Sequence, residues 1–224
     1  MLKAFIQWVK RTPHVWWTLL LPYVIAAYIV PEHIVTGAYA STAVALDGAI
    51  PFFAPAVLFY AAWFPFLVFC GLWLLLEDGT DFKRFMLGLA LNMTLAGIVY
   101  VLWPNGQDLQ PDLSQPANVF EWVLGGLYSL DTNTNVLPSL HVACALSTVA
   151  CIWDTSTVRH RSTKLLLTLL GVLISVSTVF VKQHAVLDLA AGLVLGAIAA
   201  WLSFFLLPRL PRGKRRDREA EGWS

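Results

Sequence analysis

Two residues of one apolar stretch have the types and spacing of a nucleophile and its partner. His184 and Asp188 are four residues apart, which in a helix puts both side chains on one face, about 6 Å apart along the axis. A carboxylate so placed orients one imidazole nitrogen and leaves the other free to attack an electrophile. The pairing also offsets the cost of placing a carboxylate in apolar surroundings. We therefore predict His184 as a nucleophile and Asp188 as the residue that orients it.

A second histidine follows a helix-start pattern. His141 comes after Pro138 and Ser139, and proline suits the first turn of a helix, where its missing N–H costs nothing. The free N–H groups there, with the Ser139 hydroxyl, form a site for an anion, because the positive end of the helix dipole favours negative charge. Taken singly, either histidine is equally well explained as a hydrogen-bonded residue of helix packing. The two patterns together favour a shared site.

The elements that must position these residues are membrane helices. Of the 224 residues, 58% are apolar and 13% are charged, whereas soluble domains have about 45 to 50% and about 25%. The apolar excess excludes a disordered chain, and the net charge of +1 excludes a general basic surface for nucleic acid. We predict an all-α membrane bundle of six transmembrane helices from six apolar stretches, at about 15–30, 51–76, 85–103, 136–153, 165–183 and 184–207.

The positions of the cations predict the orientation of this bundle. If all six stretches span the membrane, 14 of the 15 Lys and Arg residues fall on one side, which identifies that side as the cytoplasm. Lys182 is the exception. We thus expect a multi-pass protein of the plasma (inner) membrane, with residues 1–207 as one membrane domain, both termini cytoplasmic and 208–224 as a basic cytoplasmic tail. Alternatively, the first stretch is a signal peptide that is cleaved near Ala38-Tyr39-Ala40.

Both histidines then lie within roughly two helical turns of the extracytoplasmic ends of their spans. A bundle that brings the fourth and sixth spans together places His141 and His184 at one depth, facing one cavity. The longest outer segment, 104–135, is rich in turn-forming residues. Within it, Val119 to Leu130 is apolar enough for a short helix along the membrane surface. Tryptophans, Trp63 and Trp201 among them, lie mostly near span ends, as expected at a membrane interface.

A protein-bound metal has no support in the sequence. Cys70, Cys144 and Cys151 all lie in apolar runs, and no cysteine or histidine cluster has zinc spacing. We predict neither a metal site nor another cofactor, and no structural disulfide.

Two short blocks resemble known signatures. Leu137 to Val142 (LPSLHV) and His184 to Asp188 (HAVLD), followed by Ala190-Ala191-Gly192, are similar to the second and third signatures of the type 2 phosphatidic acid phosphatase superfamily. The resemblance implies that His184 forms a phosphohistidine, that Asp188 orients it, that His141 protonates the leaving oxygen and that Ser139 holds a phosphoryl oxygen. Such a site suits phosphoryl transfer, which needs an in-line nucleophile, a proton donor and charge stabilisation.

The sequence departs from the family pattern in its cations. The first signature, a Lys and an Arg-Pro pair, is missing, and Lys83 and Arg84 fall on the cytoplasmic side. The third signature normally begins Ser-Arg, where this chain has Ser177 and Thr178. The pattern resembles the branch similar to inositol phosphorylceramide synthases, whose bacterial members often have an arginine where Gln110 stands. Lys182 becomes the main candidate for phosphate binding; alternatively, it snorkels to the interface.

The sequence therefore predicts a membrane lipid phosphate phosphatase with an extracytoplasmic site. Its partners are a lipid phosphate substrate and the bilayer, and nucleic acid is not among them. Transfer of a lipid headgroup phosphate to an alcohol is the alternative reaction on the same site. Because the arginines are missing, a non-catalytic transporter or scaffold with the same fold is an alternative of a different class.

Overall fold

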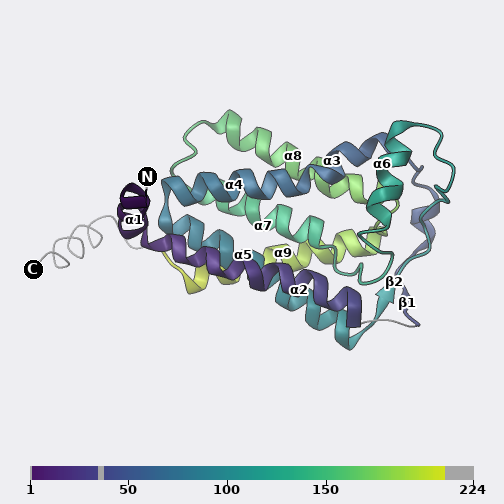
Figure 1. Cartoon of the computed structure of the whole chain (residues 1–224). Helices are drawn as coiled ribbons and strands as arrows, with labels where there is room; N and C mark the ends of the chain where they lie inside the picture. Colours follow the sequence, from purple (N-terminus) through teal and green to yellow (C-terminus); the bar gives the residue numbers. More distant parts are fainter. Residues whose placement is uncertain (1, 35–37, 210–224) are drawn as a thin grey trace, which may run out of the picture.

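A computed structural model describes residues 2–34 and 38–209 (Figure 1). As predicted, the fold is all-α, apart from a pair of two-residue strands. The helices are α1 (Leu2–Arg11), η1 (Pro13–Leu19), α2 (Leu20–Ile34), η2 (Ala45–Gly48), η3 (Ala54–Ala56), α3 (Val57–Ala61), α4 (Trp63–Glu77), α5 (Gly79–Leu102), α6 (Val119–Tyr128), α7 (Leu140–Asp154), α8 (Arg161–Phe180) and α9 (Val186–Leu206). The strands are β1 (Ala40–Ser41) and β2 (Asn105–Gly106), which pair in parallel.

Five helical segments of the described chain are long and apolar enough to cross a membrane, as a multi-pass membrane protein requires: Pro13–Pro31, Ala54–Glu77, Gly79–Leu102, Arg161–Phe180 and Val186–Leu206. The remaining predicted span, 136–153, forms α7, which has only 15 residues. Residues 136–139 of this span are not helical and lead into α7. The number of six spans therefore stays a prediction. The short helix expected within Val119–Leu130 is confirmed as α6.

Helix α7 is the centre of the bundle and packs against α5, α8 and α9 (Figure 1). Ten of its 15 residues are buried. Asn92 of α5 donates a hydrogen bond to Ser147 of α7 at 2.9 Å, in the apolar interior. An interhelical polar pair of this kind fixes how two apolar helices face each other.

The contact between α7 and α9 depends on two glycines. A Cβ atom added at Gly192 would lie 2.6 Å from the Ser139 carbonyl oxygen, and one added at Gly196 would lie 2.6 Å from that of Ala143. Glycines four residues apart let two backbones approach without a layer of side chains between them. Figure 1 shows the two helices side by side at the middle of the molecule.

The end of the bundle where α5 begins carries a group of charged residues, Asp81, Arg84, Asp154 and Arg209, which we call the ion-paired end. Arg84 lies 2.5 Å from Asp154, and Arg209 lies 2.5 Å from Asp81. Arg84 also donates to the carbonyl of Leu207 at 2.7 Å. These contacts tie α5 to the ends of α7 and α9.

The expected loop between the second and third spans is shorter than predicted. Helix α5 begins at Gly79, so Lys83 and Arg84 belong to its first turns. The cause is Asp78, whose side chain accepts hydrogen bonds from the N–H groups of Thr80 and Asp81 and so caps the helix there. The predicted tail 208–224 lies outside the described residues, except for Pro208 and Arg209. Cys70, Cys144 and Cys151 are buried free thiols.

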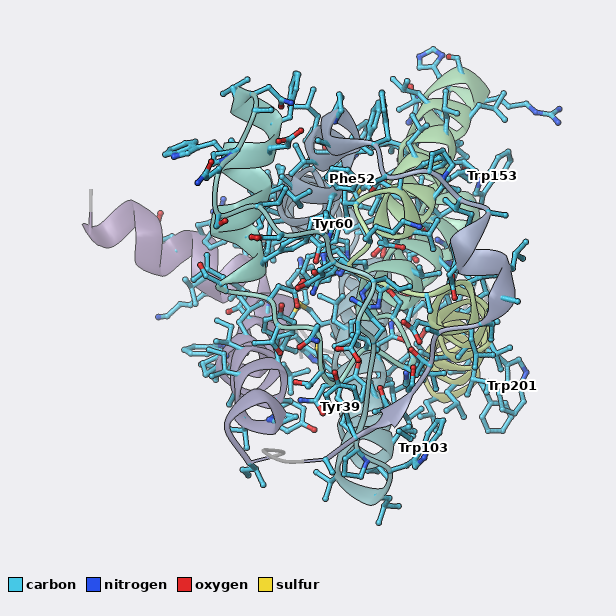
Figure 2. All side chains as sticks on the ribbon, turned by 90° about the vertical axis from the view of Figure 1, so that its right-hand side faces the viewer. Tyr39, Phe52, Tyr60, Trp103, Trp153 and Trp201 are labelled. Carbon is cyan, nitrogen blue, oxygen red and sulfur yellow. The ribbon has the colours of Figure 1, made fainter. Side chains whose placement is uncertain are left out.

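The side chains on the flanks of the bundle are mainly apolar and exposed, as the bilayer requires. Trp201 is 63% exposed and projects outward at the periphery in the end-on view, whereas Tyr60 lies near the centre (Figure 2). This central region, at the bundle end opposite the ion-paired end, contains the candidate site.

Candidate active site

The two histidines predicted to share a site are neighbours in the structure. Ser139, the residue before α7, donates its N–H to the carbonyl of Asp188 in the first turn of α9 at 3.1 Å. This bond and the close approach at Gly192 place the starts of the two helices side by side. The rings of His141 and His184 meet edge to face, with centroids 5.8 Å apart. We call this region, with Asp188 and Asp131, the histidine end.

Asp188 lies beside His184, but not on a shared helical face as the four-residue spacing predicts, because α9 begins at Val186 and His184 belongs to the preceding turn. The His184 Nδ1 and Asp188 Oδ2 atoms are 3.5 Å apart, and both side chains are buried. Asp188 Oδ2 also accepts the N–H of Ala185 at 2.7 Å, which fixes the carboxylate at the start of α9. Because Nδ1 faces the carboxylate, Nε2 is the nitrogen left for chemistry.

His141 is held by aromatic rings that the sequence analysis did not assign to the site. Its ring stacks on Tyr60 of α3, with centroids 4.3 Å apart and planes at 25°. Trp63 of α4 packs against it at 4.6 Å. The two aromatic rings enclose the imidazole and fix its orientation beside His184. Trp63 was predicted at the membrane interface, but it is only 2% exposed because it packs on His141.

A second carboxylate joins the site from the loop after α6. Asp131 accepts a hydrogen bond from the hydroxyl of Tyr60 and one from Tyr28 of α2, the latter at 3.4 Å. Burial raises the pKa of Asp131, while the Tyr60 hydrogen bond and the charge of nearby His184 act against this rise. The signal that could have found it was its position in the Asp131-Thr132-Asn133 segment beside the second signature.

Ser139 is the N-cap residue of α7, so Pro138 lies before the helix and not in its first turn as predicted. The Ser139 hydroxyl is buried and makes no hydrogen bond in the described structure. The same is true of His184 Nδ1 and Asp188 Oδ1. Buried polar atoms are nearly always paired, so the free Ser139 hydroxyl and Asp188 Oδ1 within one small region point to a functional site.

Lys182 lies in the turn between α8 and α9, next to the site. Its backbone has φ of 57°, and its side chain is only 9% exposed, so it does not extend into solvent. The Nζ atom donates to the carbonyls of Asp47 at 2.8 Å and Ile50 at 2.6 Å. An ammonium has three donors, so at most one remains for a phosphate oxygen.

Asp47 also binds the turn between α8 and α9. It is buried, and its carboxylate accepts the N–H of Val186 at 2.8 Å, at the start of α9. Asp47 and Lys182 therefore fix the segment around η2 over the turn that carries His184.

Amide side chains occupy the place where the resemblance expects an arginine. Gln110 donates to the side chain of Gln183 at 2.7 Å, immediately before His184. Gln183 in turn donates to the carbonyls of Asp131 and Thr132. Gln107 donates to the carbonyls of Lys182 and Gln183 at 2.9 and 3.1 Å. These amides hold the loops around the site in place without supplying positive charge.

The position of the other missing arginine has a structural role here. The carbonyl of Thr178 accepts the N–H groups of Gln183 and His184, both at 3.1 Å. Ser177 donates its hydroxyl to the carbonyl of Ile174. Arg84 cannot replace the missing cation, because it belongs to the ion-paired end.

Within residues 2–34 and 38–209, no group of three or more His, Cys, Asp or Glu side chains could hold a metal ion.

A comparison with protein families matches residues 40–202 to the model described as the PAP2 superfamily. The chain belongs to the PAP2 superfamily. The match covers both histidine signatures and the helices that carry them. No curated protein and no solved structure matched the chain in the other two comparisons. PAP2 membership and apolar helices together identify a membrane protein of a family of phosphatases and phosphotransferases.

Proposed function

We propose that this PAP2 protein is a lipid phosphate phosphatase that acts through a phosphohistidine. The observation that carries the proposal is the contact of His141 with His184, which in turn lies 3.5 Å from Asp188. Nucleophile, orienting carboxylate and proton donor are the groups that phosphoryl transfer requires, and here they lie together at the starts of two helices.

The reaction proceeds in two displacements. His184 Nε2 attacks phosphorus, the bond from phosphorus to the lipid oxygen breaks, and His141 gives its proton to that oxygen. Water then attacks phosphorus, the nitrogen–phosphorus bond breaks, and His141 takes up the proton of the attacking water. Ser139 and the free N–H groups at the start of α7 stabilise the phosphoryl oxygens. Lys182 contributes the one N–H that it does not donate to a carbonyl.

Phosphate release tests this proposal directly. Purified protein in detergent should release phosphate from phosphatidic acid, phosphatidylglycerophosphate, ceramide phosphate or polyprenyl pyrophosphate. Absence of both phosphate release and headgroup exchange with all four would instead support the transporter or scaffold alternative.

Headgroup transfer to an alcohol is the second candidate reaction, and the lack of cations favours it. Gln110 and Thr178 stand where related proteins have arginines, and Lys182 is largely engaged by carbonyls. A monoester carries more negative charge than a diester, so a site with few cations discriminates against it. Faster turnover of a diester in the presence of an alcohol acceptor would support transfer, as in the branch similar to inositol phosphorylceramide synthases.

The proposed site faces the extracytoplasmic side of the plasma (inner) membrane, and cysteine labelling tests this orientation. Asp112 and Ser162 are both exposed, near opposite ends of the bundle. In a background without the native cysteines, an impermeant maleimide should label Asp112→Cys in intact cells and leave Ser162→Cys unlabelled. The opposite pattern would overturn the orientation.

A further inference from the structure

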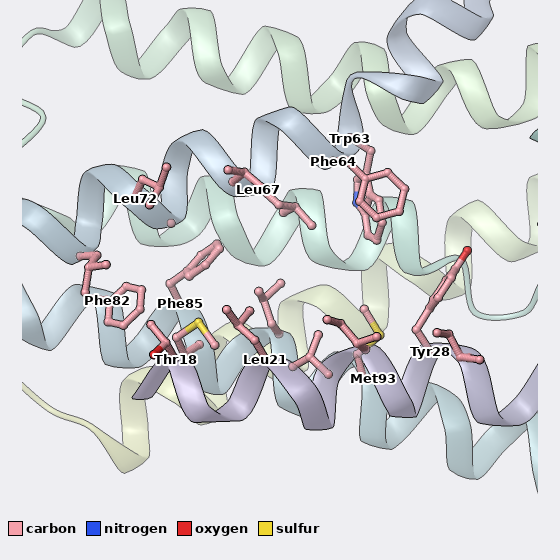
Figure 3. Close-up of a pocket in the computed structure, with 18 residues that line it drawn as sticks. Thr18, Leu21, Tyr28, Trp63, Phe64, Leu67, Leu72, Phe82, Phe85 and Met93 are labelled. Carbon is pink, nitrogen blue, oxygen red and sulfur yellow. The ribbon is translucent and has the colours of Figure 1, made fainter. Parts of the chain in front are cut away.

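An apolar cavity of about 530 Å³ lies between α2, α4 and α5 (Figure 3). Its walls include Leu21 of α2, Leu67 and Leu72 of α4, and Phe85 and Met86 of α5. Among the described residues, no charged side chain lines it. The volume lies within the range of small-molecule pockets, and the lining excludes a charged headgroup or a polar peptide.

The cavity is open sideways, on a flank that would face the bilayer. Ile25, Phe64 and Val68 line it and yet are 56%, 60% and 59% exposed. A hydrocarbon chain can therefore enter between α2 and α4 directly from the membrane, without passing through water.

One end of the cavity adjoins the histidine end. Trp63 and Tyr28 line it there (Figure 3). The Trp63 ring packs on His141, and the Tyr28 hydroxyl binds Asp131. Phe82, at the opposite end in Figure 3, lies between the ion-paired residues Asp81 and Arg84 of α5. From Trp63 to Leu75 the helix rises by roughly 18 Å.

The same end holds a buried donor without an acceptor. The Trp63 Nε1 atom is buried and makes no hydrogen bond within the described structure. An indole N–H can only donate, and leaving it unpaired costs free energy. An oxygen atom at the junction of a hydrocarbon chain and a phosphate would satisfy it.

We infer that this cavity binds one hydrocarbon chain of the lipid phosphate substrate, with Trp63 Nε1 donating to an oxygen of the chain's linker. The inference rests on the proposed function, because the phosphate is then placed at His184. An extended chain advances about 1.2 Å per bond, a third of the advance of an extended residue, so the cavity accommodates about 15 bonds in single file.

Photolabelling tests the site without requiring turnover. Palmitoyl lysophosphatidate with a diazirine at the chain terminus should crosslink to residues near Thr18 and Phe82. Unlabelled palmitoyl lysophosphatidate or farnesyl phosphate should compete, and the better competitor identifies an acyl or a prenyl chain. Labelling spread over the outer flanks, or competition by neither compound, would overturn the inference.

A blocking variant with a matched control gives the second test. Leu67→Trp fills the middle of the cavity, whereas Leu76→Trp adds the same side chain on the outer face of α4, where Leu76 is 67% exposed. Because several methylenes lose their burial, Leu67→Trp should reduce the preference for palmitoyl over hexanoyl lysophosphatidate by roughly a hundredfold. Leu76→Trp should leave this preference unchanged. Equal behaviour of the two variants in both turnover and photolabelling would contradict the inference.

The two proposals fail in different ways. Specific photolabelling in the cavity without phosphate release or headgroup transfer would support the chain-binding site and contradict the proposed enzymatic function. Turnover with unchanged chain preference in Leu67→Trp would preserve the function and remove the chain site.

Discussion

The two ends of the helical bundle differ in how fully their buried polar groups are paired. At the ion-paired end, Arg84 and Arg209 satisfy the carboxylates of Asp81 and Asp154 at distances down to 2.5 Å. At the histidine end, Ser139 Oγ and Asp188 Oδ1 are buried without a hydrogen bond in the described structure. The first arrangement holds helices together. The second retains unused bonding capacity that a ligand can take up.

Charge alone therefore does not locate the site. The strongest charge pairs lie where we propose no chemistry. The proposed chemistry lies where His141, packed between Tyr60 and Trp63, meets His184. Variants at the two ends should therefore separate activity from stability.

The largest effect is expected for His184→Ala. Removal of the nucleophile should lower kcat by roughly ten-thousandfold or more, with little change in the thermal unfolding temperature in detergent. Phosphate release and circular dichroism measure the two quantities. Retention of substantial turnover by a folded His184→Ala protein would show that the histidine end does not work as proposed.

His141→Ala should have a large effect that depends on the leaving group. Loss of a proton donor costs roughly a hundredfold to ten-thousandfold, and a phenolate needs less protonation than a lipid alkoxide. Turnover of p-nitrophenyl phosphate should thus fall much less than that of a lipid monoester. Equal losses on both substrates would contradict the acid role.

Arg84→Met should produce the opposite pattern. It removes the buried ion pair of Arg84 with Asp81 and the half-exposed one with Asp154, and loss of a buried pair costs about 3 kcal/mol. The unfolding temperature should fall, while kcat per folded molecule stays the same. Lys83→Met, one residue earlier and in no described ion pair, is the matched control. A loss of kcat without a loss of stability in Arg84→Met would contradict the assignment of stability to the ion-paired end and activity to the histidine end.

The smallest effect concerns the pH dependence of stability at Asp131. Because burial raises its pKa, the folded state binds this proton more tightly than the unfolded state, and stability rises as pH falls through the raised value. Asp131→Asn should remove this contribution. Asp112→Asn should act with the opposite sign, because the Ser114 backbone hydrogen bond lowers the pKa of Asp112. Thermal unfolding from neutral to acidic pH compares the variants with the wild type.

The helical architecture was predictable because apolar runs report directly on membrane helices. The clustering of His141 with His184 was predictable as well, since each stands at a fixed place near a helix start. The start of α5 was placed too late because the prediction followed the beginning of the apolar run, whereas the helix begins at the cap formed by Asp78. Asp is a preferred N-cap residue, so this start has a sequence signal that apolar runs alone do not show.

The surroundings of the histidines were not predictable from spacing. Tyr60, Trp63 and Asp131 reach them from other elements, and their contacts depend on long-range packing. The engagement of Lys182 by the carbonyls of Asp47 and Ile50 depends on a loop more than 130 residues away. Whether Lys182 also binds phosphate, as the sequence predicts, stays a prediction.

The glycine contact between α7 and α9 restricts the movement of these two helices relative to each other. With backbones in direct contact at Gly192 and Gly196, these two helices cannot slide or rotate past each other without a steric clash, so the histidine pair moves as one rigid unit. Helix α2 packs mainly on α5 and is open to the bilayer on its other side. We therefore expect the largest movements of the bundle in α2. Displacement of α2 would let a lipid enter, while α7 and α9 keep His141 and His184 aligned.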